Sequence, residues 1–411
     1  MKDGPHFLWR RFGKLLAVAT AVLAFVAVCL PAAASAATKA WTVMVYLDAD
    51  NTLEKLGPTD FVNELCNPGS GSNVNVVTLF DRGSMKDNTY GGWTDTKLFY
   101  CTAGETPTAA NQVADWGEMD MGNSATLSRF ITYCKTNYPA THYALAFWDH
   151  GDMWYPGYYI VRDDTGANGK ATSLDLDKQS AAFAAAGGVD VIASDQCQMQ
   201  MIENLSVWAP YAKAAVASED TVNNTGLNYG TMTANLQASP SMTAEQAANM
   251  IAQTTTSPTD SMTYSAVQLD ARFTTLENAV NKWATDMRAT MTTNKSAYTA
   301  ARTATKSFEK QDEFDLYDAA AQVKAKVADA TIKADCDAVM AAVSADVTYN
   351  WTNGSSAEKN AHGLAIWWPS SSLQYKMNDA SFDDWLYYTT KIPFGATNAW
   401  SPFLHVFVTG S

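Results

Sequence analysis

Short apolar runs alternate with amphipathic stretches through the first half of the chain. A short apolar, β-branched run is typical of a strand buried on both faces, whereas apolar residues three and four positions apart indicate a helix. The expected strands are Trp41–Leu47, Val74–Phe80, Trp93–Tyr100, Tyr143–Trp148, the run that begins at Val189, and Ala214–Ala217. The expected helices are Phe61–Leu65, Leu127–Tyr138, Leu174–Ala186 and one marked by Met201, Ile202, Leu205 and Trp208. This alternation predicts an α/β fold with a mainly parallel sheet and helices on both faces.

The pattern changes after Gly230, where helical spacing and residues such as Ala, Met and Leu dominate. We therefore expect a mostly helical C-terminal half. Its expected elements are helices at Thr243–Thr255, Thr274–Asn294, Phe314–Val327 and Ala334–Ala345, strands at Tyr264–Leu269 and Leu364–Trp368, and a last helix near Ser401 with Pro402 at its first position. No low-complexity linker separates the halves. We divide the chain into a sheet-forming region, residues 37–235, and a helical region, residues 236–411, packed on it.

The first 36 residues have the composition of a secretory signal. Arg10, Arg11 and Lys14 form a basic segment, an apolar run follows from Leu15 to Leu30, and Ala34-Ser35-Ala36 matches an A-x-A cleavage site. We expect residues 1–36 to be removed on export. The remaining chain would then be secreted or extracytoplasmic, with no stable membrane span.

Charge and cysteine content narrow the possible functions. The formal net charge is −14, from 42 acidic against 28 basic residues, which argues against nucleic acid as a partner because phosphate binding requires a basic surface. The motifs H-E-x-x-H, G-x-S-x-G and G-x-G-x-x-G, the P-loop and C-x-x-C are absent from the sequence, so zinc, lipase-like and nucleotide sites are not favoured. Beyond the signal the cysteines are Cys66, Cys101, Cys134, Cys197 and Cys336, and both disulfides and isolated buried thiols remain open for four of them.

Two predicted strands end in reactive side chains. Tyr143–Trp148 runs into Asp149-His150-Gly151, and the strand that begins at Val189 runs into Asp195-Gln196-Cys197. Functional groups in α/β sheets gather at the carboxyl ends of strands, so His150 and Cys197 form a candidate dyad in which the imidazole takes the thiol proton. The alternatives are a buried structural cysteine and a loop histidine.

The other histidines are poorer candidates for the base. His142 precedes its strand, His362 begins one and His405 lies in an apolar helix where we expect it to pack. Asp149 adjoins His150 on the strand, where neighbours point to opposite faces, so it is a poor third member of a triad.

Several blocks of sequence resemble the clostripain-like cysteine peptidases, from the clan that includes caspases, legumains and gingipains. The resemblance spans most of the chain beyond the signal. The blocks that carry it are Trp41–Asn51, Phe147–Gly151 with Trp154, Asp195–Glu203, Ala217–Glu219, Gly226–Tyr229 and Gly363–Pro369. Gln196 departs from the family, which often has Ala there, and Asp48-Ala49-Asp50 is more acidic than usual.

The resemblance implies a caspase-like fold and a peptidase acting on protein or peptide substrates. It implies that Cys197 is the nucleophile, that His150 is the base and then the acid, and that the N–H groups of Gly151 and Cys197 form the oxyanion hole. It also implies that Asp195 binds an Arg or Lys side chain before the scissile bond. A loop cap or a local ion pair is the alternative role for Asp195.

The family also suggests two accessory properties. The chemistry requires no cofactor and we assign no metal ligands, but some relatives are activated by calcium, which favours clustered carboxylates such as Asp163-Asp164 or the pair Asp175 and Asp177. Several relatives cut themselves between the catalytic His and Cys. Here Lys170 lies in the most turn-rich segment and is the first candidate for such a cut, with Arg162 second; Lys178 falls within a predicted helix.

Three further side chains admit two interpretations, and the function admits more than one. Trp154 and Tyr155 could wall a substrate cleft or anchor the core, and Glu203 could orient a loop by hydrogen bonds but is interpreted as structural. The alternative functions are a non-catalytic homologue that binds peptides or cell-surface ligands, and a transpeptidase or amidase that uses the same dyad.

Overall fold

The computed structural model describes residues 38–83, 87–157, 159–255, 263–310, 312–355, 358–371 and 384–410. The predicted signal segment, residues 1–36, lies outside the described residues, as does Tyr158. Within these ranges no helix combines the length and apolar character needed to cross a bilayer. The five described cysteines are free thiols.

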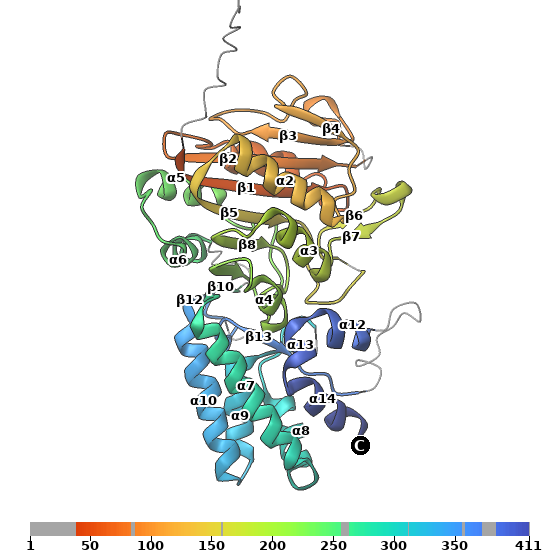
Figure 1. Cartoon of the computed structure of the whole chain (residues 1–411), viewed down its shortest axis with the longest axis vertical. Coiled ribbons are helices and arrows are strands. Elements are labelled where there is room, and N and C mark those ends of the chain that lie inside the picture. Colours follow the sequence, from red (N-terminus) through yellow and green to blue (C-terminus); the bar gives the residue numbers. More distant parts are fainter. Residues whose placement is uncertain are drawn as a thin grey trace, which may run out of the picture. The chain divides into compact units, whose positions relative to one another are not determined.

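A nine-stranded sheet with the order β12-β10-β9-β8-β5-β1-β2-β3-β4 organises the fold (Figure 1). Its strands are β1 (Lys39–Ala49), β2 (Val74–Arg82), β3 (Thr96–Tyr100), β4 (Ala114–Gly117), β5 (Ala140–Trp148), β8 (Val191–Asp195), β9 (Ala214–Ala217), β10 (Thr263–Gln268) and β12 (Val347–Thr352). The five central strands, β9, β8, β5, β1 and β2, are mutually parallel, and the four outer strands pair antiparallel. The predicted mainly parallel α/β sheet is therefore confirmed, with antiparallel margins added.

Helices cover both faces of the sheet. One face packs against α2 (Ser124–Asn137), α3 (Leu176–Ala186) and α4 (Ile202–Trp208) through side chains such as Phe130, Phe183 and Leu205. The other packs against α1 (Gly57–Asp60), the single-turn helix η1 (Phe61–Leu65), α5 (Tyr229–Ala238) and α6 (Ala244–Thr254). Because both faces are covered, the central strands are almost continuously apolar, which is why the hydrophobic pattern located them.

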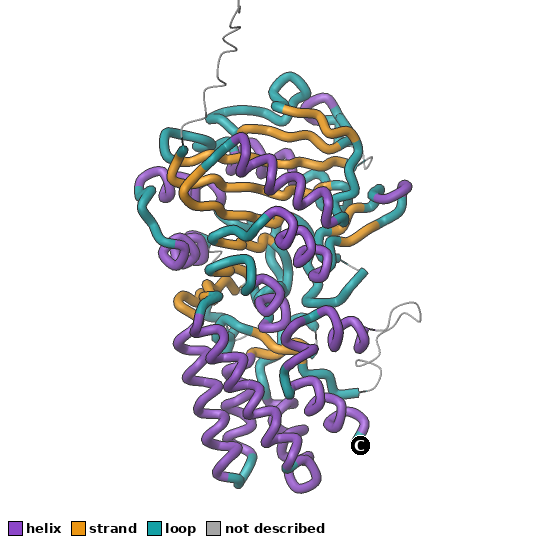
Figure 2. Tube along the Cα trace, viewed as in Figure 1, coloured by secondary structure: helices purple, strands orange, loops and turns teal. Residues whose placement is uncertain are grey.

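The C-terminal half is mostly helical (Figure 2). Its elements are α7 (Ala271–Ala289), α8 (Met291–Ala304), α9 (Leu316–Lys326), α10 (Ala330–Asp346), α12 (Asp384–Lys391), α13 (Pro393–Thr397), α14 (Trp400–Thr409) and the paired strands β11 (Glu313–Asp315) and β13 (Ala365–Trp367). The helix predicted over Thr274–Asn294 is wrong in its extent, because two helices meet at Thr290, whose φ of −104° and ψ of 12° break the helical path. Pro402 is the third residue of α14 rather than the first.

Small elements connect the larger ones near the carboxyl edge of the sheet. The two-residue strands β6 (Arg162–Asp163) and β7 (Thr172–Ser173) pair antiparallel and enclose the 3₁₀ turn η3 (Ala167–Gly169), while a second 3₁₀ turn, η2 (Thr89–Gly91), follows β2. The segment from Arg162 to Ser173 is thus a closed hairpin-like loop beside the sheet.

Candidate active site

The two reactive side chains anticipated from the sequence lie at the ends of neighbouring strands. β5 and β8 are paired in register from Ala144 with Val191 to Trp148 with Asp195. His150 follows β5 and Cys197 follows β8, and both line one cavity of about 220 Å³. That cavity is lined by Leu53, Leu56, Asp60, Trp148, Asp149, His150, Asp195, Gln196, Cys197, Val222, Asn223, Asn224 and Gly226. The structure therefore brings His150, Cys197 and Asp195 together.

Gly151 allows the two loops to approach each other. A Cβ atom at Gly151 would lie 2.2 Å from the carbonyl oxygen of Cys197 and 3.0 Å from its backbone nitrogen. Gln196 reinforces this contact, because its Nε2 donates to the carbonyl of His150 at 2.6 Å while its Oε1 accepts from Ser194 Oγ at 2.9 Å. The side chain that departs from the family pattern thus ties the Cys loop to the His loop.

Groups from the end of β1 hold the histidine. Thr52 Oγ1 lies 2.8 Å from His150 Nε2. Asn51 Nδ2 donates to Asp149 Oδ1 at 2.9 Å and to the carbonyl of Arg162 at 2.8 Å, and Asp149 in turn accepts from the backbone N–H of His150. Sequence reasoning missed Thr52, since a threonine after a strand carries no signal of its own.

Burial keeps the candidate dyad neutral. It lowers the pKa of His150, and the nearby Arg162 lowers it further. It raises the pKa of the Cys197 thiol, although the Val222 N–H, 3.3 Å from Sγ, acts in the opposite direction. At neutral pH the structure therefore favours a protonated thiol and an uncharged imidazole over a thiolate–imidazolium pair.

Asp195 lies in the same cavity with little exposure to solvent. The residue is 8% exposed, and burial raises the pKa of its carboxyl group to about 7. Gly226 is needed beside it, because a Cβ there would lie 2.4 Å from Asp195 Oδ1. A buried carboxylate that faces a cavity is suited to bind a cationic side chain, because among the described residues no Lys, Arg or His forms an ion pair with Asp195.

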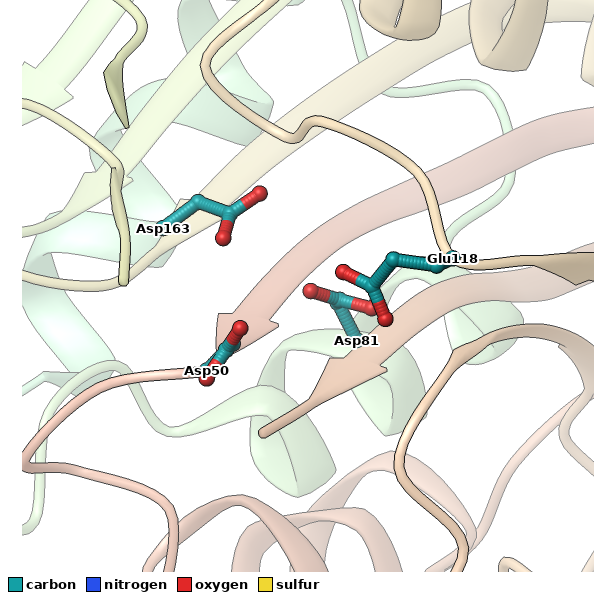
Figure 3. A group of neighbouring side chains, drawn as sticks. All are labelled: Asp50, Asp81, Glu118 and Asp163. Atoms are coloured by element: carbon teal, nitrogen blue, oxygen red, sulfur yellow. The ribbon is translucent and has the colours of Figure 1, made fainter. Parts of the chain in front are cut away.

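A separate acidic cluster lies near the carboxyl ends of β1 and β2 (Figure 3). Asp50, Asp81, Glu118 and Asp163 each offer a carboxylate oxygen, and these atoms lie within 4.8 Å of one another. Asp81 is fully buried; its Oδ1 accepts from Thr96 Oγ1 at 2.6 Å, but its Oδ2 has no hydrogen-bond partner among the described residues. Burial raises the pKa of Asp163 and of Glu118 to about 7. Clustered hard oxygen atoms with one unpartnered buried carboxylate oxygen fit a cation such as Ca²⁺.

The acidic pairs singled out in the sequence contribute only one member to this cluster, Asp163. Asp164 pairs with Arg162 at 2.7 Å, Asp175 pairs with Lys178 at 3.1 Å, and Asp177 accepts from Tyr387 at 3.1 Å. Asp81 and Glu118 were not anticipated, since they are far apart in the sequence and meet only in the folded sheet.

Trp154 and Glu203, two further candidate residues, are in contact with buried aromatic side chains. Trp154 is fully buried against Trp367 and Tyr388, and Glu203 accepts from the backbone N–H of Trp367 at 3.1 Å and from Tyr388 at 3.2 Å. The expectation that His405 packs in its helix is wrong, because it lies on the exposed side of α14.

The two basic residues considered for self-cleavage differ in their surroundings. Lys170 is exposed between η3 and β7. Arg162 belongs to β6, pairs with Asp164, and places its guanidinium 5.0 Å from the ring centroid of Tyr159, which itself lies edge-on to the His150 ring at 5.3 Å.

The fold and the cavity together define an α/β protein with a cysteine and a histidine at the carboxyl edge of a parallel sheet. The Clostripain family model, peptidase C11, matches residues 45–406, so the chain belongs to the clostripain family of cysteine peptidases. Clostripain of Hathewaya histolytica is 29% identical in an alignment of 212 residues that covers 46% of this chain and 40% of that protein. The match thus spans well under half of the curated relative.

Two solved structures have a similar fold. One is a secreted C11 cysteine protease from Bacteroides thetaiotaomicron in complex with an irreversible peptide inhibitor, with a TM-score of 0.64, 15% identity, and coverage of 88% of this chain and 99% of that chain. The other is an inactive zymogen C11 protease from Parabacteroides distasonis, with a TM-score of 0.62, 17% identity, and coverage of 81% and 93%.

Proposed function

We propose that this chain is a cysteine endopeptidase that hydrolyses peptide bonds after Arg or Lys through Cys197 and His150. The observation that carries the proposal is that one cavity is lined by a thiol, an imidazole and a buried carboxylate, Asp195. Family membership supports the chemistry, and the buried carboxylate supports a cationic residue before the scissile bond.

In the proposed reaction, His150 accepts the proton of the Cys197 thiol as Sγ attacks the scissile carbonyl carbon. The backbone N–H groups of Gly151 and Cys197, whose loops are in close contact, stabilise the oxyanion. When the C–N bond breaks, His150 gives that proton to the leaving amine. Water then attacks the thioester, its proton passes to His150, and the carboxylic acid leaves as the thiol regains a proton.

The test is hydrolysis of matched fluorogenic peptides with Arg, Lys or a neutral residue at the cleaved position. We expect Cys197→Ala and His150→Ala to abolish hydrolysis while the circular dichroism spectrum stays unchanged. Cys336→Ala removes a buried thiol elsewhere and is the matched control, with activity retained. Near-normal turnover by folded Cys197→Ala protein would overturn the dyad.

We also propose that the acidic cluster binds calcium as an accessory ion. Asp50, Asp81, Glu118 and Asp163 would hold it, and the ion would supply positive charge between β1, β2 and the loop that contains Asp163. The catalytic steps do not involve it.

Export is the remaining part of the proposal. The sequence pattern of residues 1–36 supports a removable signal, and the similar Bacteroides protease is described as secreted. Residues 37–235 would then form the catalytic region, with residues 236–411 packed on it. Sequencing the N-terminus of the protein recovered outside the cytoplasm tests the cleavage site.

A further inference from the structure

The proposed substrate cavity contains a second carboxylate, Asp60, which the sequence did not single out. Asp60 is the last residue of α1, on the chain segment that follows β1, whereas Asp195 ends β8. Both carboxylates line the cavity that also contains Cys197 and His150. Two acidic groups from distant segments of the chain therefore line the same cavity as the thiol.

The fold fixes the position of Asp60. Trp148 Nε1 donates to Asp60 Oδ2 at 2.9 Å. Trp148 is the last residue of β5 and is only 4% exposed, so the strand that leads to His150 also holds this carboxylate. Asp60 is thus half-buried and is held by a hydrogen bond from a buried side chain.

The negative charge of Asp60 affects the pKa of Asp195. Burial raises the pKa of Asp60 to about 6 and that of Asp195 to about 7, and the charge of Asp60 contributes to the increase at Asp195. Glu64 lies nearby, with its pKa raised to about 7 by burial, but it accepts from the Tyr229 N–H at 3.0 Å and is not among the residues that line the cavity. A cationic ligand in the cavity would relieve the repulsion between Asp60 and Asp195.

We propose that Asp60 and Asp195 together bind the guanidinium of the substrate, so that the site prefers Arg to Lys. The inference rests on the proposed peptidase function and extends it. A guanidinium is planar and has five N–H donors, so it can donate to two separate carboxylates at once. An ammonium is a compact charge on a flexible stem and gains less from the second carboxylate.

The first experiment compares one peptide sequence that carries Arg, Lys or citrulline at the cleaved position. Citrulline keeps the shape of Arg without its charge. We expect Asp60→Asn to lower kcat/KM for Arg about tenfold, to lower it less for Lys, and to leave citrulline unchanged. Asn retains an oxygen that can accept from Trp148, and unchanged citrulline hydrolysis reports that the site is still folded.

Glu64→Gln is the matched control, because it removes a neighbouring buried charge that does not line the cavity. It should leave the Arg to Lys ratio unchanged, while Asp195→Asn should weaken both cationic substrates. The proposal would be overturned if Asp60→Asn changed kcat/KM equally for the Arg, Lys and citrulline peptides. It would also be overturned if Asp60→Asn and Glu64→Gln gave the same Arg to Lys ratio of kcat/KM.

A binding experiment separates this inference from the catalytic one. Cys197→Ala protein, alone and with Asp60→Asn, is titrated by calorimetry with butylguanidinium and with pentylammonium. We expect the second substitution to weaken butylguanidinium binding about tenfold and pentylammonium binding less. If the wild-type protein hydrolyses no peptide but the calorimetry shows this difference, the peptidase proposal is refuted and the guanidinium subsite is retained. Equal weakening of both ligands would refute the subsite.

Discussion

Thr52 contacts the ring of His150, as the third residue of a catalytic triad would. Its Oγ1 is 2.8 Å from His150 Nε2, which is consistent with an Nε2–H tautomer; in the proposed reaction the unprotonated Nδ1 of that tautomer accepts the thiol proton. Asp149, the adjacent acid, is instead engaged with Asn51 and with the His150 backbone. We therefore interpret Thr52 as a positioning residue that orients the ring.

Replacing Thr52 by Val tests this role. We expect kcat to fall about tenfold with little change in KM, because the imidazole loses the hydrogen bond that selects its tautomer. Thr52→Ser should restore most of the rate, and the acid limb of the pH–rate profile should move in the Val variant. A parallel rise in KM with unchanged kcat would show that Thr52 contacts substrate instead.

The pKa directions of the two proposed dyad residues predict how the reactivity of the Cys197 thiol depends on pH. Because burial raises the pKa of Cys197 and lowers that of His150, an ion pair should not form in the resting enzyme. The rate of Cys197 alkylation by iodoacetamide should therefore keep rising above pH 8, since only the thiolate reacts. A flat rate between pH 5 and pH 8, read by mass spectrometry of the labelled peptide, would instead indicate a thiolate–imidazolium pair.

At the scale of elements, the hydrophobic pattern of the sequence predicted the strands that precede His150 and Cys197. The central strands β1, β2, β5, β8 and β9 are apolar on both faces, so His150, Asp195 and Cys197 could be placed at strand ends. The edge strand β12 is only partly buried, so the hydrophobic pattern did not predict it. The break between two helices at Thr290 was not predicted either, because no helix-breaking residue marks it. Thr52, Asp60 and Asp81 could not be assigned because their partners come from distant segments.

The loop between β6 and β7 is the element in which we expect self-cleavage. Lys170 is exposed there, whereas Lys178 lies in α3 and is held by Asp175. If the chain processes itself, the new fragment should begin at Ala171 in the wild-type protein and be absent from Cys197→Ala protein. N-terminal sequencing decides between Lys170 and the second candidate, Arg162. A single uncut and fully active chain would contradict the prediction.

At the scale of the whole molecule, the acidic cluster makes stability depend on both cation and pH. Asp163 and Glu118 have pKa values raised to about 7, above those of free carboxyl groups near 4, so the folded state holds more protons. Their contribution to stability is fully present below pH 4 and is lost as pH rises toward 7 unless a cation replaces the protons.

We therefore expect calcium to raise Tm more at pH 8 than at pH 5. A ligand at about 100 times its Kd stabilises a protein by about 2.7 kcal/mol, which for a chain of this size is a few degrees. Melting curves of chelator-treated protein with and without calcium measure the effect. Asp81→Asn should abolish it, and Asp115→Asn, which alters an exposed acid paired with Lys97, should not. If calcium raised Tm equally in the two variants, its binding site would lie outside the acidic cluster.

The contact between Gly151 and Cys197 also bears on how this family member can vary. A methyl group at position 151 would overlap the main chain of the cysteine loop, so even the smallest side chain would displace Cys197, the proposed nucleophile. We therefore expect Gly151, which has no reactive side chain, to tolerate substitution as poorly as Cys197 does. Substitutions among the other residues that line the cavity are compatible with the fold only while these two backbones remain in contact.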